Sequence, residues 1–374
     1  MFSGIWPIYK TIANLDIVKA GFIAMVGGLL GNMMQIVFGL YSDYGYRKLS
    51  IVFGMSLVGA AAFFPYTNNY TILLILVFAT LVGSSAFHPA GTGSVGLVTI
   101  RKKGLAISSF ISVGTLGFAF SQIIFKEIYT FFNGKTLIMI VLPATALFMA
   151  CFTRFENDKS SRGSVNIRSE IRKLINTCKG YIFIIYLIEV CLAATIISFI
   201  FILPELMQAK GYSQTWCHGG AHMLFVIGAT IIIIPAGHFS DKTSQKLVLF
   251  ISLISTLILY YLFLSSPKIH LALFLPMVIC MGGALGTGNP IGVTLGNRLA
   301  HGQVSLVSAL LMGFAWGGGS FSTLLVGYLS KKLESPITAL YYMGIFVMIA
   351  LILTFFLPGK QRVIEIESKY VMKI

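Results

Sequence analysis

Charged residues are scarce in this chain of 374 residues, where they make up 10% of the sequence against 56% hydrophobic residues. A soluble domain carries about 25% charged residues, so the composition excludes an ordinary soluble protein. Cysteine is also scarce, and the five present form no Cys-x-x-Cys pair, which argues against a disulfide framework and a zinc site. A basic N-terminal stretch followed by an apolar core is lacking as well, so we expect no cleavable signal peptide.

The sequence instead has a series of apolar segments of the length that crosses a bilayer, about 18 to 25 residues. Lipid satisfies no backbone polar group, so such segments form helices or a closed barrel. Continuous rather than alternating apolar runs exclude the barrel. We therefore predict an all-α membrane protein with eleven complete transmembrane helices, at approximately 20–41, 49–66, 70–88, 104–125, 135–153, 180–207, 219–238, 247–265, 269–291, 303–329 and 337–357.

The net charge of +15 raises the question of a nucleic-acid partner. With the loop after the first segment placed in the cytoplasm and the sides alternating from there, 19 of the 27 Lys and Arg residues lie on the cytoplasmic side. The positive-inside rule predicts this orientation, with a cytoplasmic C-terminus. The charge reflects membrane topology, so we expect a multi-pass protein of a bacterial cytoplasmic (inner) membrane and no nucleic-acid partner.

Two charged turns of similar sequence lie 198 positions apart, GLYSDYGYRK at 39–48 and GHFSDKTSQK at 237–246. A period of this size predicts two equivalent halves, as in transporters built from parallel repeats. The sixth predicted helix begins near Lys179, and its counterpart in the first half would start about 20 residues before Met1. We therefore expect a six-plus-six arrangement whose first helix is largely missing.

This arrangement predicts four parts of the chain. Residues 1–153 form an N-terminal helical bundle, and 154–179 form a cytoplasmic linker whose second half has the spacing of an amphipathic surface helix. Residues 180–357 form a six-helix C-terminal bundle, and 358–374 form a cytoplasmic tail.

The first charged turn resembles the loop signature of the major facilitator superfamily, Gly-x-x-x-Asp-x-Gly-x-Arg-Lys, and the second turn keeps part of it. The matching residues are Gly39, Asp43, Gly45, Arg47, Lys48, Gly237, Asp241 and Lys246. The segments 84–93, 104–124, 198–207 and 312–332 resemble the fosmidomycin-resistance branch of that superfamily. The resemblance implies the superfamily's fold, two six-helix bundles related by a pseudo-two-fold axis, and a cytoplasmic gate at the charged turns. The alternative is a solvated turn that obeys the positive-inside rule.

Glu189 lies about a third of the way into an apolar predicted helix, with no basic residue near it in the sequence. An isolated acid at such a depth costs about 2.5–3.5 kcal/mol on insertion scales. The helix must therefore turn Glu189 toward a cavity or a partner, and a protonatable acid in a transport pathway is a natural proton carrier. The alternative is a permanently neutral Glu that forms a hydrogen bond between helices.

Four more residues are candidates for the transport pathway. His88, which together with Pro89 ends the third predicted helix, titrates near neutrality and either relays protons or caps helix carbonyls at a proline-made stop. Gln122, Asn289 and Trp316 are candidates for the lining of a solute cavity. Glu205 is expected to extend to the outer interface of the membrane.

Two further patterns have simpler interpretations. His218 and His222 have the i, i+4 spacing of a metal pair, but no acid or cysteine pair is near them in the sequence, so we expect an outer-surface pair and no metal. GTGSVG at 91–96 fits a nucleotide-loop pattern but follows a membrane helix rather than a strand. Like the glycines at 281–292 and 316–320, it is expected to permit close helix packing.

The sequence therefore predicts a secondary active transporter that moves a small organic solute by alternating access, with proton-coupled efflux as the leading mode. An importer on the same scaffold and a non-transporting membrane sensor or scaffold are the alternatives. No nucleophile–base pair or ATP-binding motif is present, so we predict that the chain is not an enzyme and uses no cofactor. The expected partners are the solute, a proton and the lipid bilayer, with the chain as a monomer.

Overall fold

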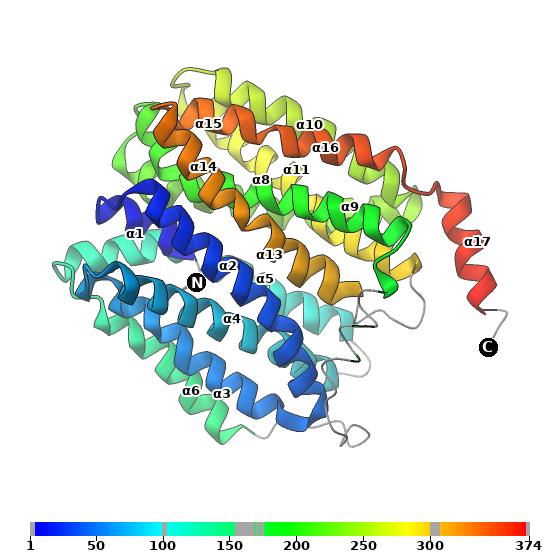
Figure 1. The fold of residues 1–374 in the computed structure, drawn as a ribbon, viewed down its shortest axis with the longest axis horizontal. Coiled ribbons are helices and arrows are strands. Elements are labelled where there is room, and N and C mark those ends of the chain that lie inside the picture. The colour runs from blue at the N-terminus through cyan, green and yellow to red at the C-terminus, as the bar shows by residue number, and fades with distance from the viewer. Residues whose placement is uncertain are drawn as a thin grey trace.

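The structure is a computed structural model that describes residues 4–98, 103–153, 169, 172, 176–299 and 307–371. Throughout these residues the regular structure is helical, and most helices run side by side along the long axis of the molecule (Figure 1). The prediction of an all-α protein is confirmed. Most of the predicted linker at 154–179, including its amphipathic helix, lies outside the described residues.

We call the helices before residue 154 the first set and those from residue 181 to 354 the second set. The first set consists of α1 (Trp6–Ile12), α2 (Ile17–Tyr41), η2 (Ser42–Tyr46), α3 (Arg47–Val58), η3 (Gly59–Tyr66), α4 (Tyr70–Val98), α5 (Lys103–Phe131), η4 (Leu137–Ile140) and α6 (Val141–Phe152). The second set consists of α8 (Tyr181–Ala209), η5 (Trp216–Gly220), α9 (Ala221–Lys242), α10 (Gln245–Ser265), α11 (Leu271–Leu299), η6 (Ala309–Phe314), α13 (Ala315–Gly319), α14 (Phe321–Lys332), α15 (Pro336–Met343) and α16 (Ile345–Thr354). A separate helix, α17 (Lys360–Val371), stands apart near the C-terminus (Figure 1).

Nine helical segments within the described ranges are long and apolar enough to cross a membrane, and Leu137–Phe152 is a shorter apolar one. Each of the eleven predicted segments falls on a helix, so the hydropathy pattern located the helices correctly. Three predicted ends are too early, and the helices predicted to stop at 125 and 291 continue to Phe131 and Leu299. The helix expected to stop at His88 and Pro89 continues through the proline to Val98, as membrane helices permit when neighbouring groups satisfy the freed carbonyl.

The 198-residue repeat has a structural basis in the two charged turns. The Ser42 hydroxyl donates to the Phe38 carbonyl (2.7 Å), and Ser240, 198 residues later, donates to the Gly237 carbonyl (2.8 Å). In both turns the serine hydroxyl thus donates to a carbonyl of the preceding helical turn, four residues back in the first and three residues back in the second.

The lysines that end the two turns also have matching roles. Lys48 Nζ donates to the Cys151 carbonyl at the end of α6 (2.7 Å). Its counterpart Lys246 donates to the carbonyls of Phe355 and Leu357, just after α16 (2.8 and 2.7 Å). A lysine at a helix C-terminus satisfies carbonyls that lack an intrahelical partner. In each set, therefore, the charged turn is fastened to the end of the last helix.

Close backbone approach joins α9 to α11. A Cβ atom on Gly228 would overlap the Ile279 carbonyl, and one on Gly282 would overlap the Phe225 carbonyl. The two helices can therefore touch along their backbones only because both positions are glycine, the packing that small residues give in membranes.

Replacing Gly282 by Ala is expected to destabilise the protein by about 2 kcal/mol, because the added methyl group meets backbone that cannot turn aside. The measurement is the thermal unfolding midpoint of the purified protein in detergent. Gly237→Ala on the same helix pair is the control, since nothing lies within 4 Å of a Cβ there. Equal midpoints for the two variants would show that the close approach does not limit stability.

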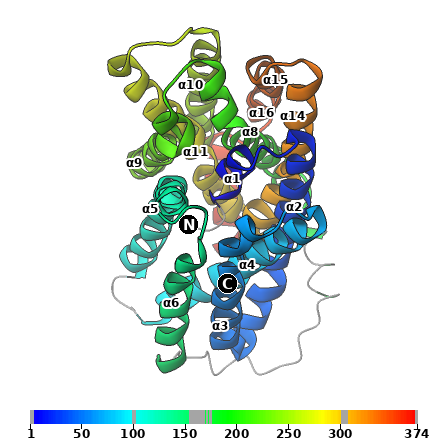
Figure 2. The ribbon, with the colours of Figure 1, turned by 90° about the vertical axis from the view of Figure 1, so that its left-hand side faces the viewer.

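Contacts between the two sets include α1 against α8 and two flanks. Figure 2 shows α2 beside α14 on one flank and α5 facing α9 on the other. On the first flank, Thr323 Oγ1 donates to the Gly21 carbonyl (2.9 Å) and Lys331 Nζ donates to Asp16 Oδ2 (2.5 Å). On the second, Gly219, whose φ is +119°, lies against Gln122. These contacts hold the sets together near the end of the molecule where α2 begins and α14 finishes.

Protonation of Asp16 is expected to weaken this contact. The hydrogen bond from Lys331, followed by the Lys19 backbone N–H, holds the pKa of Asp16 below its usual range. A carboxyl whose pKa is lower in the folded than in the unfolded protein stabilises the fold above its unfolded pKa, and this stabilisation is lost as the pH falls through the lowered folded value.

The unfolding midpoint should therefore decline below about pH 4, by the equivalent of less than about 1 kcal/mol because the pair is exposed. This decline should be smaller in Asp16→Asn than in the parent. An unchanged acid profile in Asp16→Asn would mean that the pair does not contribute.

Candidate functional site

Glu189 is fully buried in the middle of the second set. It lies on α8, and its Oε2 accepts a hydrogen bond from Asn289 Nδ2 on α11 (2.6 Å). The same amide nitrogen is 3.5 Å from the Leu311 carbonyl of η6. Two residues that the sequence singled out separately, 100 positions apart, therefore meet at a junction of three elements.

The backbone of α11 forms one wall of this site. Gly292 lies one turn beyond Asn289, and a Cβ there would overlap Glu189 Oε1. The carboxyl group therefore rests against the helix at a place where only glycine leaves room for it. Any larger residue at position 292 would displace the acid from its pocket.

The second carboxyl oxygen of Glu189, Oε1, has no hydrogen-bond partner among the described residues. Nor does any described Lys or Arg form an ion pair with this carboxyl group. A buried carboxylate without a cation is costly, and such a group is accommodated far more readily when it carries a proton. The geometry therefore suits a carboxyl that takes up and releases a proton as its surroundings change.

The glycine-rich stretch at 316–320 places α13 between the two sets. Gly317 faces the Leu29 carbonyl of α2, while Gly319 lies against Ala193 of α8. Trp316, at the start of this stretch, is half-buried. The expectation that these glycines serve close helix packing agrees with the contacts, and α13 therefore contacts both sets.

The other predicted pathway residues lie on the first set, away from this junction. Gln122 on α5 is buried against Gly219, and its Nε2 has no partner among the described residues. The His88 side chain on α4 is exposed, beside the ring of Phe87. Within the described structure, neither residue forms a hydrogen bond with Glu189, so the roles proposed for them require a solute or water between the sets.

The signature turn of the first set is built around Gly45 and Arg47. Gly45 has φ +97°, a conformation that favours glycine, and allows α2 to pass into α3. Arg47 is buried, with its guanidinium against Gly93 of α4, where a Cβ would be 3.2 Å from Nε. The solvated-turn alternative does not describe Arg47, although the side chain of Asp43 lies outside the described residues.

The second turn lacks this arginine in sequence, but another residue supplies the cation. Gln245, 198 residues after Arg47, accepts a hydrogen bond from Arg298 Nη1 of α11 (3.1 Å). Asp241 in the same turn is exposed. A guanidinium group therefore lies at the corresponding helix junction in both sets, contributed by a different helix in each.

Sequence reasoning missed an ion pair between Lys10 and Glu205. Lys10 on α1 is buried, forms an ion pair with Glu205 of α8, and has its Nζ 4.5 Å from the centroid of the Phe201 ring. Thr11 Oγ1 donates to the same Glu205 oxygen (3.1 Å). The expectation that Glu205 extends to the membrane interface is therefore wrong. The signal was Lys10 itself, a cation inside the apolar stretch WPIYKTI.

The expected outer-surface histidine pair is also wrong. His222 is buried edge-on against Phe118 of α5 (4.8 Å between ring centroids). The chain leaves regular helix at His218 and Gly219, so the i, i+4 geometry is lost. No group of three or more His, Cys, Asp or Glu side chains suited to a metal ion occurs within the described ranges.

Comparisons with known proteins agree with the fold. The sequence model of the Major Facilitator Superfamily matches residues 1–305. The chain is 23% identical to the fosmidomycin resistance protein of Escherichia coli K12, over 97% of this chain and 89% of that protein. It is 22% identical to an uncharacterized MFS-type transporter, YfnC, of Bacillus subtilis, over 98% and 91%.

Solved structures show the same architecture at low sequence identity. The nucleoside transporter NupG superposes with a TM-score of 0.75 at 13% identity, over 95% of this chain and 93% of that one. The Escherichia coli fucose:proton symporter FucP superposes with a TM-score of 0.57 at 13% identity, over 91% and 97%. At these identities the likeness establishes the fold alone, and it agrees with the fold expected from the charged turns.

Proposed function

The chain belongs to the Major Facilitator Superfamily, and from this premise we propose that it is a proton-coupled exporter of a small organic solute. It is a membrane transporter by family and not an enzyme. The observation that carries the proton coupling is Glu189, a fully buried acid with an amide as partner and one carboxyl oxygen free of hydrogen bonds within the described structure. The similarity to the fosmidomycin resistance protein supports export.

The places where the two sets touch support the proposal of alternating access. The ion pair of Asp16 with Lys331 and the hydrogen bond of Thr323 to Gly21 hold together one end of the molecule. With the C-terminus in the cytoplasm, as the positive-inside rule predicts, this is the outer end. The conformation is then closed to the outside, and the proposed cytoplasmic gate at the Arg47 turn is the element that closes in the opposite state.

The proposed cycle uses competition at Glu189. A proton enters from the outside in the outward-open state and neutralises the carboxyl group, which allows the empty carrier to reorient. In the inward-open state the proton leaves to the cytoplasm and the solute binds between the sets, with Asn289 and Trp316 as candidate contacts. Since one site cannot satisfy both partners at once, the inward proton gradient drives the solute outward.

An importer is the second candidate, because the same architecture occurs in the fucose:proton symporter. Export and import differ in whether protonation competes with the solute or favours its binding. A sided assay separates the two. Inverted membrane vesicles with an acidic interior, loaded with a pH-sensitive dye, are given a panel of small organic compounds that includes phosphonates.

An exporter is expected to alkalinise the lumen when its solute is added, because the solute enters as protons leave. Solute-dependent proton uptake into right-side-out vesicles, with no signal in inverted ones, would establish import. A folded protein that gives no signal in either orientation across the panel would favour the sensor or scaffold alternative.

A further inference from the structure

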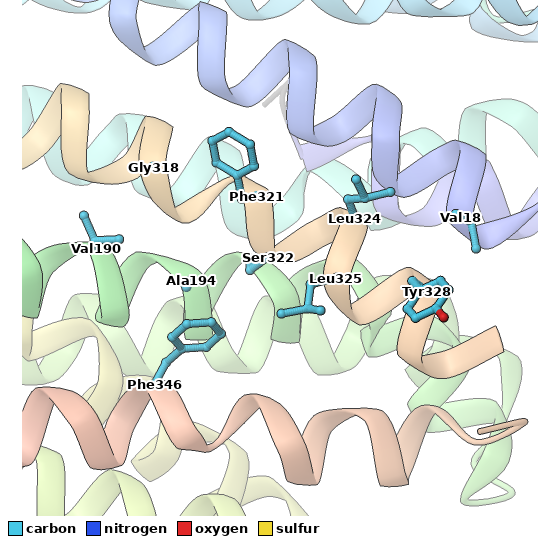
Figure 3. A pocket seen from close by; sticks show the side chains of 10 residues that line it. All are labelled: Val18, Val190, Ala194, Gly318, Phe321, Ser322, Leu324, Leu325, Tyr328 and Phe346. Carbon is cyan, nitrogen blue, oxygen red and sulfur yellow. The ribbon is translucent and has the colours of Figure 1, made fainter. Parts of the chain in front are cut away.

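A groove of about 550 Å³ opens on the flank where the two sets meet beside α14. Its lining includes Val18, Val190, Gly318, Ser322, Tyr328 and Phe346. In Figure 3, α14 and α16 form its sides, α8 lies between them, and Val18 reaches in from α2. The groove therefore faces the surroundings of the protein and not the junction that holds Glu189.

The length of the groove matches one leaflet of a bilayer. Along α13 and α14, Gly318 and Tyr328 are ten residues apart, which corresponds to about 15 Å of helix. The hydrocarbon core of a bilayer is about 30 Å thick. Tyr328 lies four residues before the end of its helix, and tyrosine is enriched at the membrane–water interface. The groove thus extends from the interface to about the middle of the membrane.

The interface end of the groove is basic. Lys332 is exposed, with its Nζ 5.7 Å from the centroid of the Tyr328 ring. Its neighbour Lys331 forms an ion pair with Asp16. Of these two lysines, Lys332 is therefore the one that can bind a ligand. Figure 3 shows the Tyr328 hydroxyl at the same end. At the headgroup level a lysine ammonium attracts an anionic lipid, and the Tyr328 hydroxyl is a hydrogen-bond donor for its phosphate.

Inside the groove the lining is almost entirely apolar. The exception is Ser322, a buried residue whose hydroxyl has no hydrogen-bond partner among the described residues. A buried hydroxyl without a partner is costly, and an ester carbonyl that entered the groove would accept its hydrogen bond. The groove is therefore cationic at the interface, has one hydroxyl further in and is otherwise apolar. This order matches the phosphate, the ester and the acyl chain of a phospholipid.

We propose that this groove binds one anionic phospholipid, with an acyl chain between α14 and α16 and its phosphate at Lys332 and Tyr328. Val18 belongs to the first set of helices and the rest of the lining to the second. A bound chain therefore contacts both sets at the end of the molecule that is closed in this structure, and it stabilises that closed end.

The test measures lipid binding to the purified full-length protein by native mass spectrometry, with palmitoyl-oleoyl phosphatidylglycerol and the matching phosphatidylcholine as probes. Gly318→Leu fills the groove, and the nearest atom to a Cβ there is 3.5 Å away, so the substitution is tolerated by the backbone. It is expected to weaken phosphatidylglycerol binding at least about tenfold, since the acyl methylenes lose their contacts.

Lys332→Gln changes an exposed residue and leaves the groove open. It is expected to weaken phosphatidylglycerol binding about fivefold, to the level of phosphatidylcholine. Ala236→Leu is the matched control, because it fills a second groove of about 320 Å³ between α9, α10 and α11. Binding of phosphatidylglycerol to this variant should equal that of the parent.

Unchanged phosphatidylglycerol binding in Gly318→Leu would overturn the site, and equal affinity of the parent for both lipids would overturn the preference for an anionic headgroup. If Gly318→Leu does not fold, Lys332→Gln decides the outcome alone. The readout involves no transport, so its result is independent of whether the chain exports, imports or moves no solute.

Discussion

Solute flux driven by a proton gradient is expected to fall to the level of protein-free vesicles when Glu189 is replaced by Gln. The amide cannot release a proton, so the step that couples the gradient to reorientation is lost. The side-chain carbonyl of Gln keeps the position that accepts the hydrogen bond of Asn289 Nδ2, now 2.6 Å long. The variant should therefore fold, bind solute and exchange it across vesicles at equal pH on both sides.

The measurement compares gradient-driven flux with solute exchange in the same proteoliposomes. Glu127→Gln makes the same chemical change at an exposed acid of α5 whose partner is Lys126 (2.8 Å), and it should transport like the parent. Gradient-driven flux that survives in Glu189→Gln would exclude Glu189 as the proton carrier. Loss of both flux and exchange would indicate instead that the carboxyl group holds α8 and α11 together.

Glu205→Ala is expected to destabilise the protein by about 3 kcal/mol, because it leaves the buried ammonium of Lys10 without its anion. The cost arises from an uncompensated charge rather than from a lost attraction. The thermal midpoint should fall, and α1 should become accessible to protease, since Glu205 also accepts the hydrogen bond of Thr11.

Removing both charges gives the matched control. In Lys10→Met/Glu205→Gln no unpaired charge stays buried, and the methionine side chain can keep contact with Phe201. This double variant should recover most of the lost stability, as replacement of buried ion pairs by apolar residues often does. If it is as unstable as Glu205→Ala, the geometry of the pair rather than its charge balance determines stability at this place.

The sequence was sufficient to locate the helices, because lipid imposes a length and a polarity on each segment that can be read one segment at a time. The repeat was equally visible in the sequence. In the structure, Lys48 and Lys246 of the two turns each donate hydrogen bonds to carbonyls at the end of the last helix of their set. That Glu189 needs a buried partner could be predicted for the same reason, since a lone acid in an apolar helix is conspicuous without knowledge of its neighbours.

Partners across the sequence could not be predicted in this way. Nothing in the local sequence of Lys10 indicates that its anion lies 195 positions away on α8. Likewise, the second charged turn has Gln245 where the first has Arg47, and Arg298 supplies a guanidinium group there only because α11 brings it to Gln245. His222 was misjudged for a related reason, since the break in the helix at Gly219 turns it toward α5. Each depends on how helices pack, which a single sequence does not state.

The hydrogen bonds of Lys48 and Lys246 have a mechanical consequence. Each joins a charged turn to the end of a neighbouring helix, α3 to α6 in the first set and α10 to the chain after α16 in the second, at the same end of the molecule. Two helices joined in this way resist sliding past each other, so a displacement of one is transmitted to the other. Spin labels within one set should therefore keep their separation during transport, while labels on α2 and α14 should move apart. The motion is then a rigid-body displacement of one set relative to the other.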